Sequence, residues 1–402
     1  MRKAVPIVTI LASAFLAGCS TPPDRRAEEA FDRGVAAVGR SDAIVRQGEA
    51  GARLLVSPRL QARVMNTQVG AVGDVGWIND PEIAEGETHP SFNNFGGQDR
   101  FWLGPEAGNF GIYFAPGAEF DRKVWKVPPD FDTGTYTLVE RGPAKVVFTR
   151  DMTLTNYAGT IFKVKVRREV GLVPASTMTG QLTVTLPPGV AYAGSYSDNT
   201  MTNTGTERWQ KDKGLLNIWI LGQFVPGPNA AIIAPFTPGE GQPYRDELYF
   251  GKIPADRLKT LGRALIFRAD AMAEGKLGIP QARTTGLAGS FDFDRNLLVI
   301  VRCDVPAEPA LYGDSTWVKN QAAPYAGDLF QTYNANRKGT PDQRAAFYEL
   351  ESVSPSRELA PGDQVRHRHA TFCFQGDYAG LREVARKVLG VDLDEVRKAM
   401  GF

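Results

Sequence analysis

The sequence predicts an all-β protein, a large antiparallel sandwich or barrel with short helices near its two ends. Short apolar or alternating runs recur through most of the chain, and 42 glycines and 27 prolines supply turns between them. The sequence shows no repeat period of the kind that a propeller would require. No linker rich in Pro, Gly or Ser interrupts the middle of the chain, so we expect one β domain over residues 43–376.

The first 18 residues have the features of a secretory signal peptide. Arg2 and Lys3 precede an apolar run that is too short to cross a membrane as a permanent helix. The run ends in Leu16-Ala-Gly-Cys19, which resembles a bacterial lipobox and predicts lipidation of Cys19; an ordinary signal peptide cleaved nearby is the alternative. Because Ser20 stands where an Asp would resemble an inner-membrane retention signal, we expect an outer-membrane lipoprotein facing the periplasm or the cell surface.

The segments that follow the signal peptide each have their own pattern. Residues 19–42 are polar with one helical stretch, which predicts a tether and a short helix. Residues 159–173 alternate between apolar and charged side chains, and residues 180–189 and 296–305 have similar patterns, so all three predict strands. Residues 377–402 have helical periodicity and predict a C-terminal helical extension.

Charge and cysteine content restrict the partners of the protein. The 46 basic and 45 acidic residues nearly balance, whereas a nucleic-acid-binding domain normally carries a basic excess, so we expect no nucleic-acid partner. Cys303 and Cys373 lie in apolar runs. They are either two buried free thiols or, in an oxidising compartment, a disulfide.

The stretch NNFGGQDRFWLGPEAGNFGIYF, residues 93–114, concentrates unusual chemistry. We expect strands at residues 101–103 and 110–114, joined by a loop from which Glu106 projects. Asp99 and Arg100 form a salt bridge that fixes the segment, or Arg100, Trp102 and Glu106 line a groove. Such a groove would offer an aromatic face to a sugar ring and charged groups to its hydroxyls. Asp99 is also a candidate binding residue.

A second group of candidate residues lies near the C-terminus. Residues two apart on a strand share a face, so Glu349 and Glu351 point the same way, as do His367 and His369. Carboxylates and histidines on neighbouring strands are suited to general acid–base catalysis, although a solvated strand face is the alternative. The His-x-His pair also suits a metal, but His89 is the only other histidine, so we expect no metal site and no cofactor.

Aromatic residues also lie beside polar residues on predicted loops. This group suits carbohydrate, which needs stacking planes and hydrogen-bonding groups rather than a deep apolar hole. Trp219 lies in an apolar strand and belongs to the core or to the groove. The remaining candidates for substrate binding are Lys252, Trp317, Tyr333 and Asn334.

The motifs FGGQDRFWLGPE, YELESVSPSRELAPGD and HRHATFCFQG resemble those of an uncharacterised family of bacterial lipoproteins related to galactose mutarotase, over residues 43–376. The resemblance implies a β supersandwich of two large antiparallel sheets with a shallow sugar-binding cleft. It also implies that Glu351 is the base, with Glu349 in reserve. The mutarotase acid, a histidine in mid-chain, has no counterpart here, so His369 or His367 is the expected proton donor.

We therefore expect a carbohydrate-binding envelope lipoprotein, held to the membrane by a lipid anchor, that acts at an anomeric centre as an epimerase, glycosidase or lyase. The alternative is a glycan-binding lipoprotein without catalysis, and a purely structural envelope role is a third hypothesis. The catalytic hypothesis requires Glu351 or Glu349, at least one of His367 and His369, and Arg100 to face one cavity.

Overall fold

The computed structural model describes residues 24–246, 250–339 and 346–402. The signal peptide and the lipobox with Cys19 lie outside these residues. Within them, no helix combines the length and the apolar character needed to cross a membrane.

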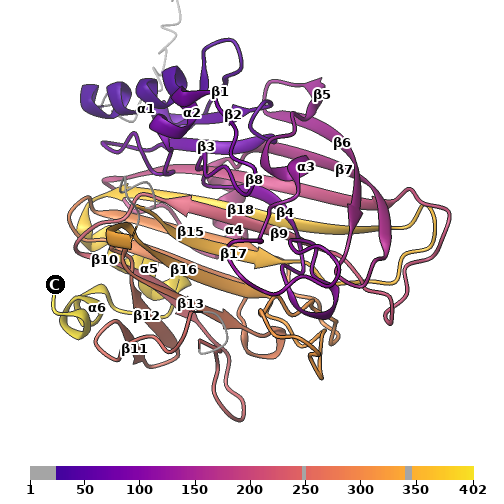
Figure 1. Ribbon diagram of the computed structural model, residues 1–402. Helices are drawn as coiled ribbons and strands as arrows, with labels where there is room; N and C mark the ends of the chain where they lie inside the picture. The colour runs from indigo at the N-terminus through magenta and orange to yellow at the C-terminus, as the bar shows by residue number, and fades with distance from the viewer. Residues whose placement is uncertain (1–23, 247–249, 340–345) are drawn as a thin grey trace, which may run out of the picture.

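Two large antiparallel sheets make up most of the fold (Figure 1). The larger sheet has ten strands in the order β11-β12-β10-β14-β15-β18-β8-β7-β6-β5. Their bounds are β5 (Thr137–Arg141), β6 (Lys145–Thr155), β7 (Ile161–Leu172), β8 (Val190–Asn203), β10 (Ala230–Pro235), β11 (Leu258–Leu261), β12 (Ala264–Arg268), β14 (Leu287–Asp292), β15 (Leu297–Cys303) and β18 (Gln364–Gly376).

The smaller sheet has five strands in the order β13-β16-β17-β9-β4. All of its strand pairs are antiparallel. The bounds are β4 (Arg100–Gly104), β9 (Asn217–Phe224), β13 (Met272–Ile279), β16 (Phe330–Asn336) and β17 (Tyr348–Val353). The predicted all-β fold of large antiparallel sheets is therefore confirmed.

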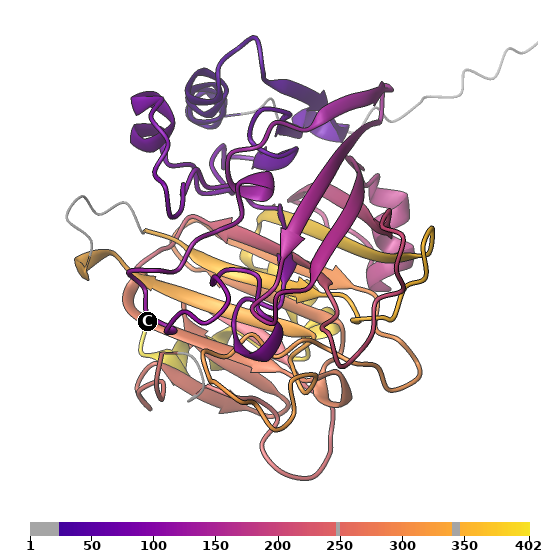
Figure 2. The same cartoon turned by 45° about the vertical axis from the view of Figure 1, so that its right-hand side comes forward.

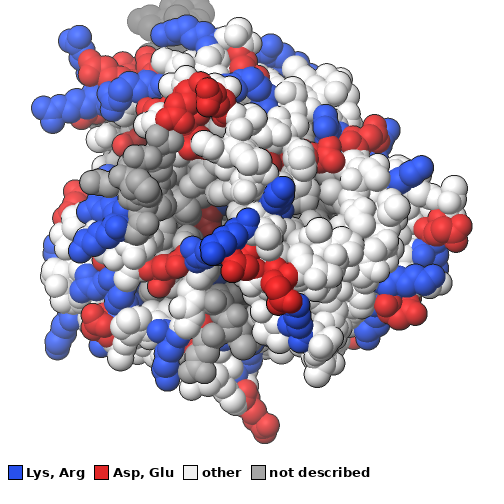
Figure 3. Space-filling model, in the orientation of Figure 1, with Lys and Arg blue, Asp and Glu red and all other residues white. Residues whose placement is uncertain are grey.

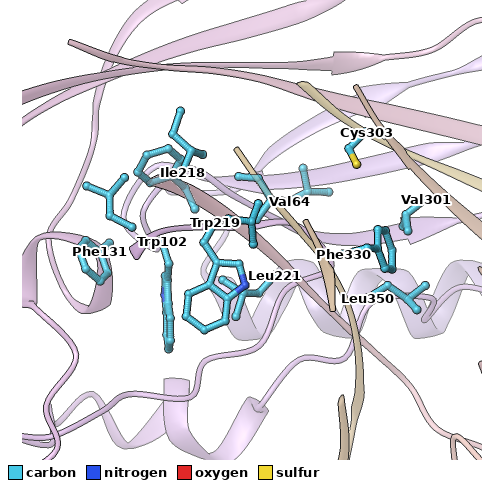
Figure 4. Close-up of a cluster of buried hydrophobic side chains, with 14 of the residues drawn as sticks. Val64, Trp102, Phe131, Ile218, Trp219, Leu221, Val301, Cys303, Phe330 and Leu350 are labelled. Atoms are coloured by element: carbon cyan, nitrogen blue, oxygen red, sulfur yellow. The ribbon is translucent and has the colours of Figure 1, made fainter. Parts of the chain in front are cut away.

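The two sheets pack face to face over the main hydrophobic core. Strand alternation places Phe162, Val164 and Val166 of β7 in this core while the lysines between them are exposed, as the sequence pattern predicts. On the opposite face of the five-stranded sheet, Trp102 of β4 lies beside Trp219 of β9 (Figure 4), with ring centroids 5.8 Å apart and planes at 85°. Such an edge-to-face pair stabilises the register of the two strands.

The outer face of the ten-stranded sheet is covered by helices. Alternate residues of its central strands, such as Leu298 and Phe372, point away from the main core into a second apolar cluster. Helices α4 (Ala175–Leu182), α5 (Tyr378–Val388) and α6 (Leu393–Met400) pack into that cluster. The predicted C-terminal helices are thus part of the packed fold.

The N-terminal residues form a small separate layer at one end of the sandwich (Figure 2). Strands β1 (Ile44–Gln47), β2 (Arg53–Ser57) and β3 (Arg63–Gln68) form a separate three-stranded sheet, which the sequence pattern does not predict. Helix α1 (Arg25–Val38) packs on this sheet through Phe31 and Val35, and α2 (Asp80–Glu85) lies beside it. The remaining helices are α3 (Pro129–Asp132) and the 3₁₀ turns Glu49–Gly51, Gly108–Phe110, Gln281–Arg283 and Arg337–Gly339.

Two of the expected strands are not strands. In residues 180–189, α4 continues to Leu182 and irregular chain follows, because Met178 and Leu182 bury their side chains at helical spacing. Residues 110–114 fold back on the preceding loop instead: Ile112 N–H donates to the Pro105 carbonyl at 3.1 Å. Cys303 and Cys373 are both free and buried, so they do not form a disulfide.

Candidate functional site

The outer face of the five-stranded sheet forms the floor of a cleft. Strand register places Tyr333, Glu349 and Gln223 side by side on β16, β17 and β9, and Lys276 of β13 extends the row. In Figures 1 and 2 the segment between β4 and α3 lies in front of this sheet. The floor therefore comes from strands and the wall from loops.

The cleft has two connected chambers. The inner chamber, about 280 Å³, reaches the floor at Arg100, Trp102, Gln223 and Glu349. The outer chamber, about 560 Å³, extends toward the N-terminal layer at Asn79 and His89. Both chambers are lined by Glu106, Arg122 and six aromatic residues, here called the aromatic collar: Phe92, Trp125, Phe250, Trp317, Tyr333 and Phe347.

Glu349 is the carboxylate that the floor presents to the inner chamber. It is paired with Arg100, whose Nη2 donates to Glu349 Oε1. Both side chains are almost fully buried. Burial raises the pKa of Glu349 to about 7; the Arg100 guanidinium opposes the rise and the neighbouring Glu351 adds to it. A carboxyl that titrates near neutrality can accept or donate a proton at physiological pH.

Glu351 shares the face of Glu349 but lies below the chamber lining. Its carboxylate accepts hydrogen bonds from Lys276 Nζ at 3.0 and 3.1 Å and from Trp219 Nε1 at 2.8 Å. The side chain is fully buried and contacts neither chamber. These contacts make Glu351 a residue that fixes Lys276 and Trp219 and that places a negative charge beside Glu349.

Glu106 faces both chambers from the loop that follows β4. Trp125 Nε1 donates to its Oε1 at 2.8 Å. Burial raises the pKa of Glu106, while Lys276 and the indoles of Trp125 and Trp317 oppose the rise. The inner chamber therefore contains a second carboxyl group with a raised pKa, supplied by the wall rather than by the floor.

The two histidines lie on the other side of the small sheet, which corrects the expectation of a cavity shared with Glu349. Ser352 follows Glu351 on β17 and points into the space between the sheets. There its Oγ shares hydrogen bonds with His367 Nε2 at 2.7 Å and His369 Nδ1 at 2.8 Å. Burial lowers the pKa of His367 to about 3 and also lowers that of His369, so both rings are neutral near pH 7 and neither is an imidazolium acid.

The expected pairing of Asp99 with Arg100 is also corrected. Adjacent strand residues point to opposite faces, so Arg100 reaches Glu349 while Asp99 points into the core. There Arg168 Nη2 donates to Asp99 Oδ1 at 2.6 Å, and Arg168 also donates to Asn199 Oδ1 at 2.7 Å. Asp99 therefore does not line the cleft, and its side chain is the ion-pair partner of Arg168 in the core.

The structure brings together some of the other predicted binding residues. Trp102 lines the inner chamber, Trp317 and Tyr333 belong to the aromatic collar, and all three lie where the groove interpretation requires. Lys252 is exposed and lines neither chamber. Asn334 Nδ2 donates to the Ala273 carbonyl at 2.8 Å, which ties β16 to β13 and keeps this side chain out of the cleft.

Several residues of the cleft were not predicted from the sequence. Lys276 and Glu274 lie two residues apart and share a face of β13, so their common orientation could have been predicted from the sequence. Arg122 and Trp125 come from an irregular loop whose sequence gives no signal of its position. The unpredicted cleft residues are Asn79, Glu82, His89, Phe92, Asn94, Arg122, Trp125, Leu221, Gln223, Phe250, Glu274, Lys276, Asn336 and Phe347.

One group of potential metal ligands occurs among the described residues. The ligand atoms of Glu82, Glu85 and His89 all lie within 4.8 Å of one another, and Glu82 and His89 line the outer chamber. Exposed carboxylates often gather without an ion, so the group does not by itself assign a metal. On the face shown in Figure 3, acidic and basic side chains are interspersed rather than gathered by sign.

Several solved structures are similar to this chain, and one of them has a TM-score above 0.5. The Slr1438 protein from Synechocystis sp. PCC 6803 is similar with a TM-score of 0.51 at 13% identity, over 90% of this chain and 100% of that chain. A galactose mutarotase-like protein from Lactobacillus casei ATCC 334 gives a TM-score of 0.46 at 12% identity, over 82% and 99%. A galactose mutarotase related enzyme from Lactobacillus acidophilus gives 0.43 at 8% identity, over 83% and 97%.

Comparison with curated proteins gives no significant match. A family match extends from residue 29 to residue 400, and so includes α5, α6 and most of α1 together with both large sheets. By this match, the chain belongs to the family of unknown function DUF6786.

Proposed function

We propose that the cleft binds a carbohydrate and acts on it by general acid–base chemistry at Glu349. The observation that carries this proposal is the position of Glu349 at the base of a chamber walled by aromatic rings. Aromatic faces suit the apolar side of a sugar ring, while buried charged groups suit its hydroxyls. The reaction class remains the one expected from the sequence, chemistry at an anomeric centre.

The proposed chemistry uses two carboxyl groups in different environments. Glu349, held by Arg100, takes a proton from the sugar as base. Glu106, whose pKa is raised by burial, gives a proton from the wall of the same chamber as acid. Two carboxyls with different surroundings can divide these roles, which removes the need for a histidine donor.

A substitution in the aromatic collar tests whether the cleft binds sugar. Trp317→Ala removes one aromatic plane, so we expect affinity for a bound sugar to fall about 3- to 10-fold, the usual worth of an aromatic contact. Titration calorimetry with a panel of mono- and oligosaccharides measures the change. Val318→Ala is the matched control, since Val318 is the next residue, is 47% exposed and lines neither chamber. Equal affinity of the wild type and Trp317→Ala for every sugar that binds would contradict the proposal.

We also propose that the protein is an outer-membrane lipoprotein, as the lipobox predicts. Cys19→Ala removes the thiol that would carry the lipid, so the variant is expected in the soluble periplasmic fraction. Fractionation followed by immunoblotting measures this, with Cys303→Ala as a control that leaves the lipobox intact. A Cys19→Ala variant that stays with the membranes would show that the lipid anchor is not what holds the protein there.

A further inference from the structure

Residues that line the two chambers have buried polar atoms that lack a hydrogen-bond partner among the described residues. On the inner floor these are Trp102 Nε1, Gln223 Oε1, and Nε and Nη1 of Arg100. In the outer chamber it is Asn79 Nδ2, on a side chain that is 2% exposed. Buried polar atoms are nearly always hydrogen-bonded in proteins, so such atoms in a cavity indicate where a polar ligand completes them.

The orientation of Asn79 is fixed by the helix that follows it. Asn79 is the N-cap of α2, and its Oδ1 accepts from Glu82 N–H at 3.5 Å. This contact uses the oxygen end of the amide and leaves the nitrogen end as the donor without a partner. The outer chamber therefore has its own hydrogen-bonding group, independent of the floor.

The dimensions of the chambers limit the length of the ligand. The inner chamber, about 280 Å³, lies at the small end of the range for ligand pockets, roughly 300–1,000 Å³. It ends at the sheet, where the side chains of the floor are almost fully buried. The outer chamber, about 560 Å³, continues through the aromatic collar toward Asn79 and His89. The cleft is thus closed at the inner end, and a bound chain of sugar units can extend only toward the outer chamber.

We propose that the cleft binds the end of a glycan chain of at least two units, with the terminal unit in the inner chamber and the next unit in the outer chamber. This inference rests on the proposed carbohydrate function and specifies its substrate class. The terminal sugar unit forms the missing hydrogen bonds of Trp102 Nε1 and Gln223 Oε1 beside Glu349. The aromatic collar stacks on both units, and Asn79 Nδ2 donates a hydrogen bond to the second unit.

Matched sugar series test the proposal by titration calorimetry on the mature protein. The probes are glucose with cellobiose and cellotriose, galactose with β-1,4-galactobiose and its trimer, and N-acetylglucosamine with its β-1,4 dimer and trimer. In a series that binds, we expect the dimer to bind at least about 10-fold more tightly than the monomer, because it gains the contacts of the outer chamber.

The variant Asn79→Asp isolates the outer chamber. Asp keeps the oxygen that caps α2, replaces the donor with a second oxygen and adds a negative charge, so a thermal melt must first show that the variant is as folded as the wild type. We expect dimer affinity to fall about 3- to 10-fold, the effect of one lost hydrogen bond, with monomer affinity unchanged. Asn320→Asp, the same change at an exposed residue that lines neither chamber, is the control.

The outcomes separate the two proposals. Equal affinity for monomer and dimer, or an Asn79→Asp variant that weakens both alike, overturns the two-unit site and leaves sugar binding intact. The absence of binding across all three series overturns the carbohydrate function and the two-unit site with it.

Discussion

The variant Glu349→Gln is expected to bind its sugar with nearly wild-type affinity and to turn it over about 10²–10⁴-fold more slowly, the usual effect of losing a general base. The amide keeps the shape of the side chain and its contact with Arg100 but cannot take up a proton. Steady-state kinetics on the sugar that binds best, together with calorimetry, separate the loss in kcat from any loss in binding.

The pH dependence of the rate provides a second measure of the same role. Burial raises the pKa of Glu349 to about 7, so the ionised base predominates above that pH and disappears below it. The rate should therefore fall as pH decreases through about 7, and Glu349→Gln should lack this inflection. Glu207→Gln, the same change at an exposed residue that lines neither chamber, is the control and should retain both kcat and the inflection. Full turnover by Glu349→Gln would exclude this residue as the base.

Asp99→Ala is expected to produce the largest loss of stability, about 3–5 kcal/mol in the free energy of unfolding. The change removes the carboxylate that Arg168 Nη2 contacts at 2.6 Å, and both side chains are buried. Arg168 would then be left as an uncompensated charge in the core, which is far more costly than losing the attraction itself. Urea denaturation followed by far-UV circular dichroism measures the loss.

Two further variants show whether the buried charge is the cause. Asp151→Ala breaks an exposed pair with Lys165 at 3.7 Å on the same sheet and should change stability by less than about 1 kcal/mol. The double variant Asp99→Ala, Arg168→Met should recover part of the loss, because no charge remains in the core. If Asp99→Ala matched Asp151→Ala in stability, the ion pair would not be what holds this part of the core.

Alternation along single strands was readable from the sequence, and the position of one strand against another was not. A spacing of two residues predicted that Glu349 and Glu351 share one strand face and that His367 and His369 share another. Both predictions are confirmed in the structure. The sequence could not say that β17 and β18 belong to different sheets. Both carboxylates thus lie on the cleft side of the small sheet, although only Glu349 lines a chamber, while the histidines face the core. This separation depends on the order of strands in each sheet.

The partner of Arg100 shows the same limit at longer range. Its carboxylate lies 249 positions away along the chain, and the two residues meet because β4 and β17 both flank β9. Nothing in either motif specifies that neighbour. The alternating pattern at residues 180–189 was misleading for a related reason, since burial of Met178 and Leu182 against the outer helices favours a helical turn there.

The division of the cleft between strands and loops has a consequence for how new specificity could arise in this fold. The floor residues Arg100 and Glu349 are held by strand pairing, whereas most of the collar comes from connecting segments, which tolerate changes in length and sequence. Exchange of the loop that carries Trp125 could therefore redirect the protein to another glycan without rebuilding the proton-transfer groups. Insertion of a single residue into β17 would have the opposite effect, because it would turn Glu349 inward and put a core-facing neighbour, Tyr348 or Leu350, in its place.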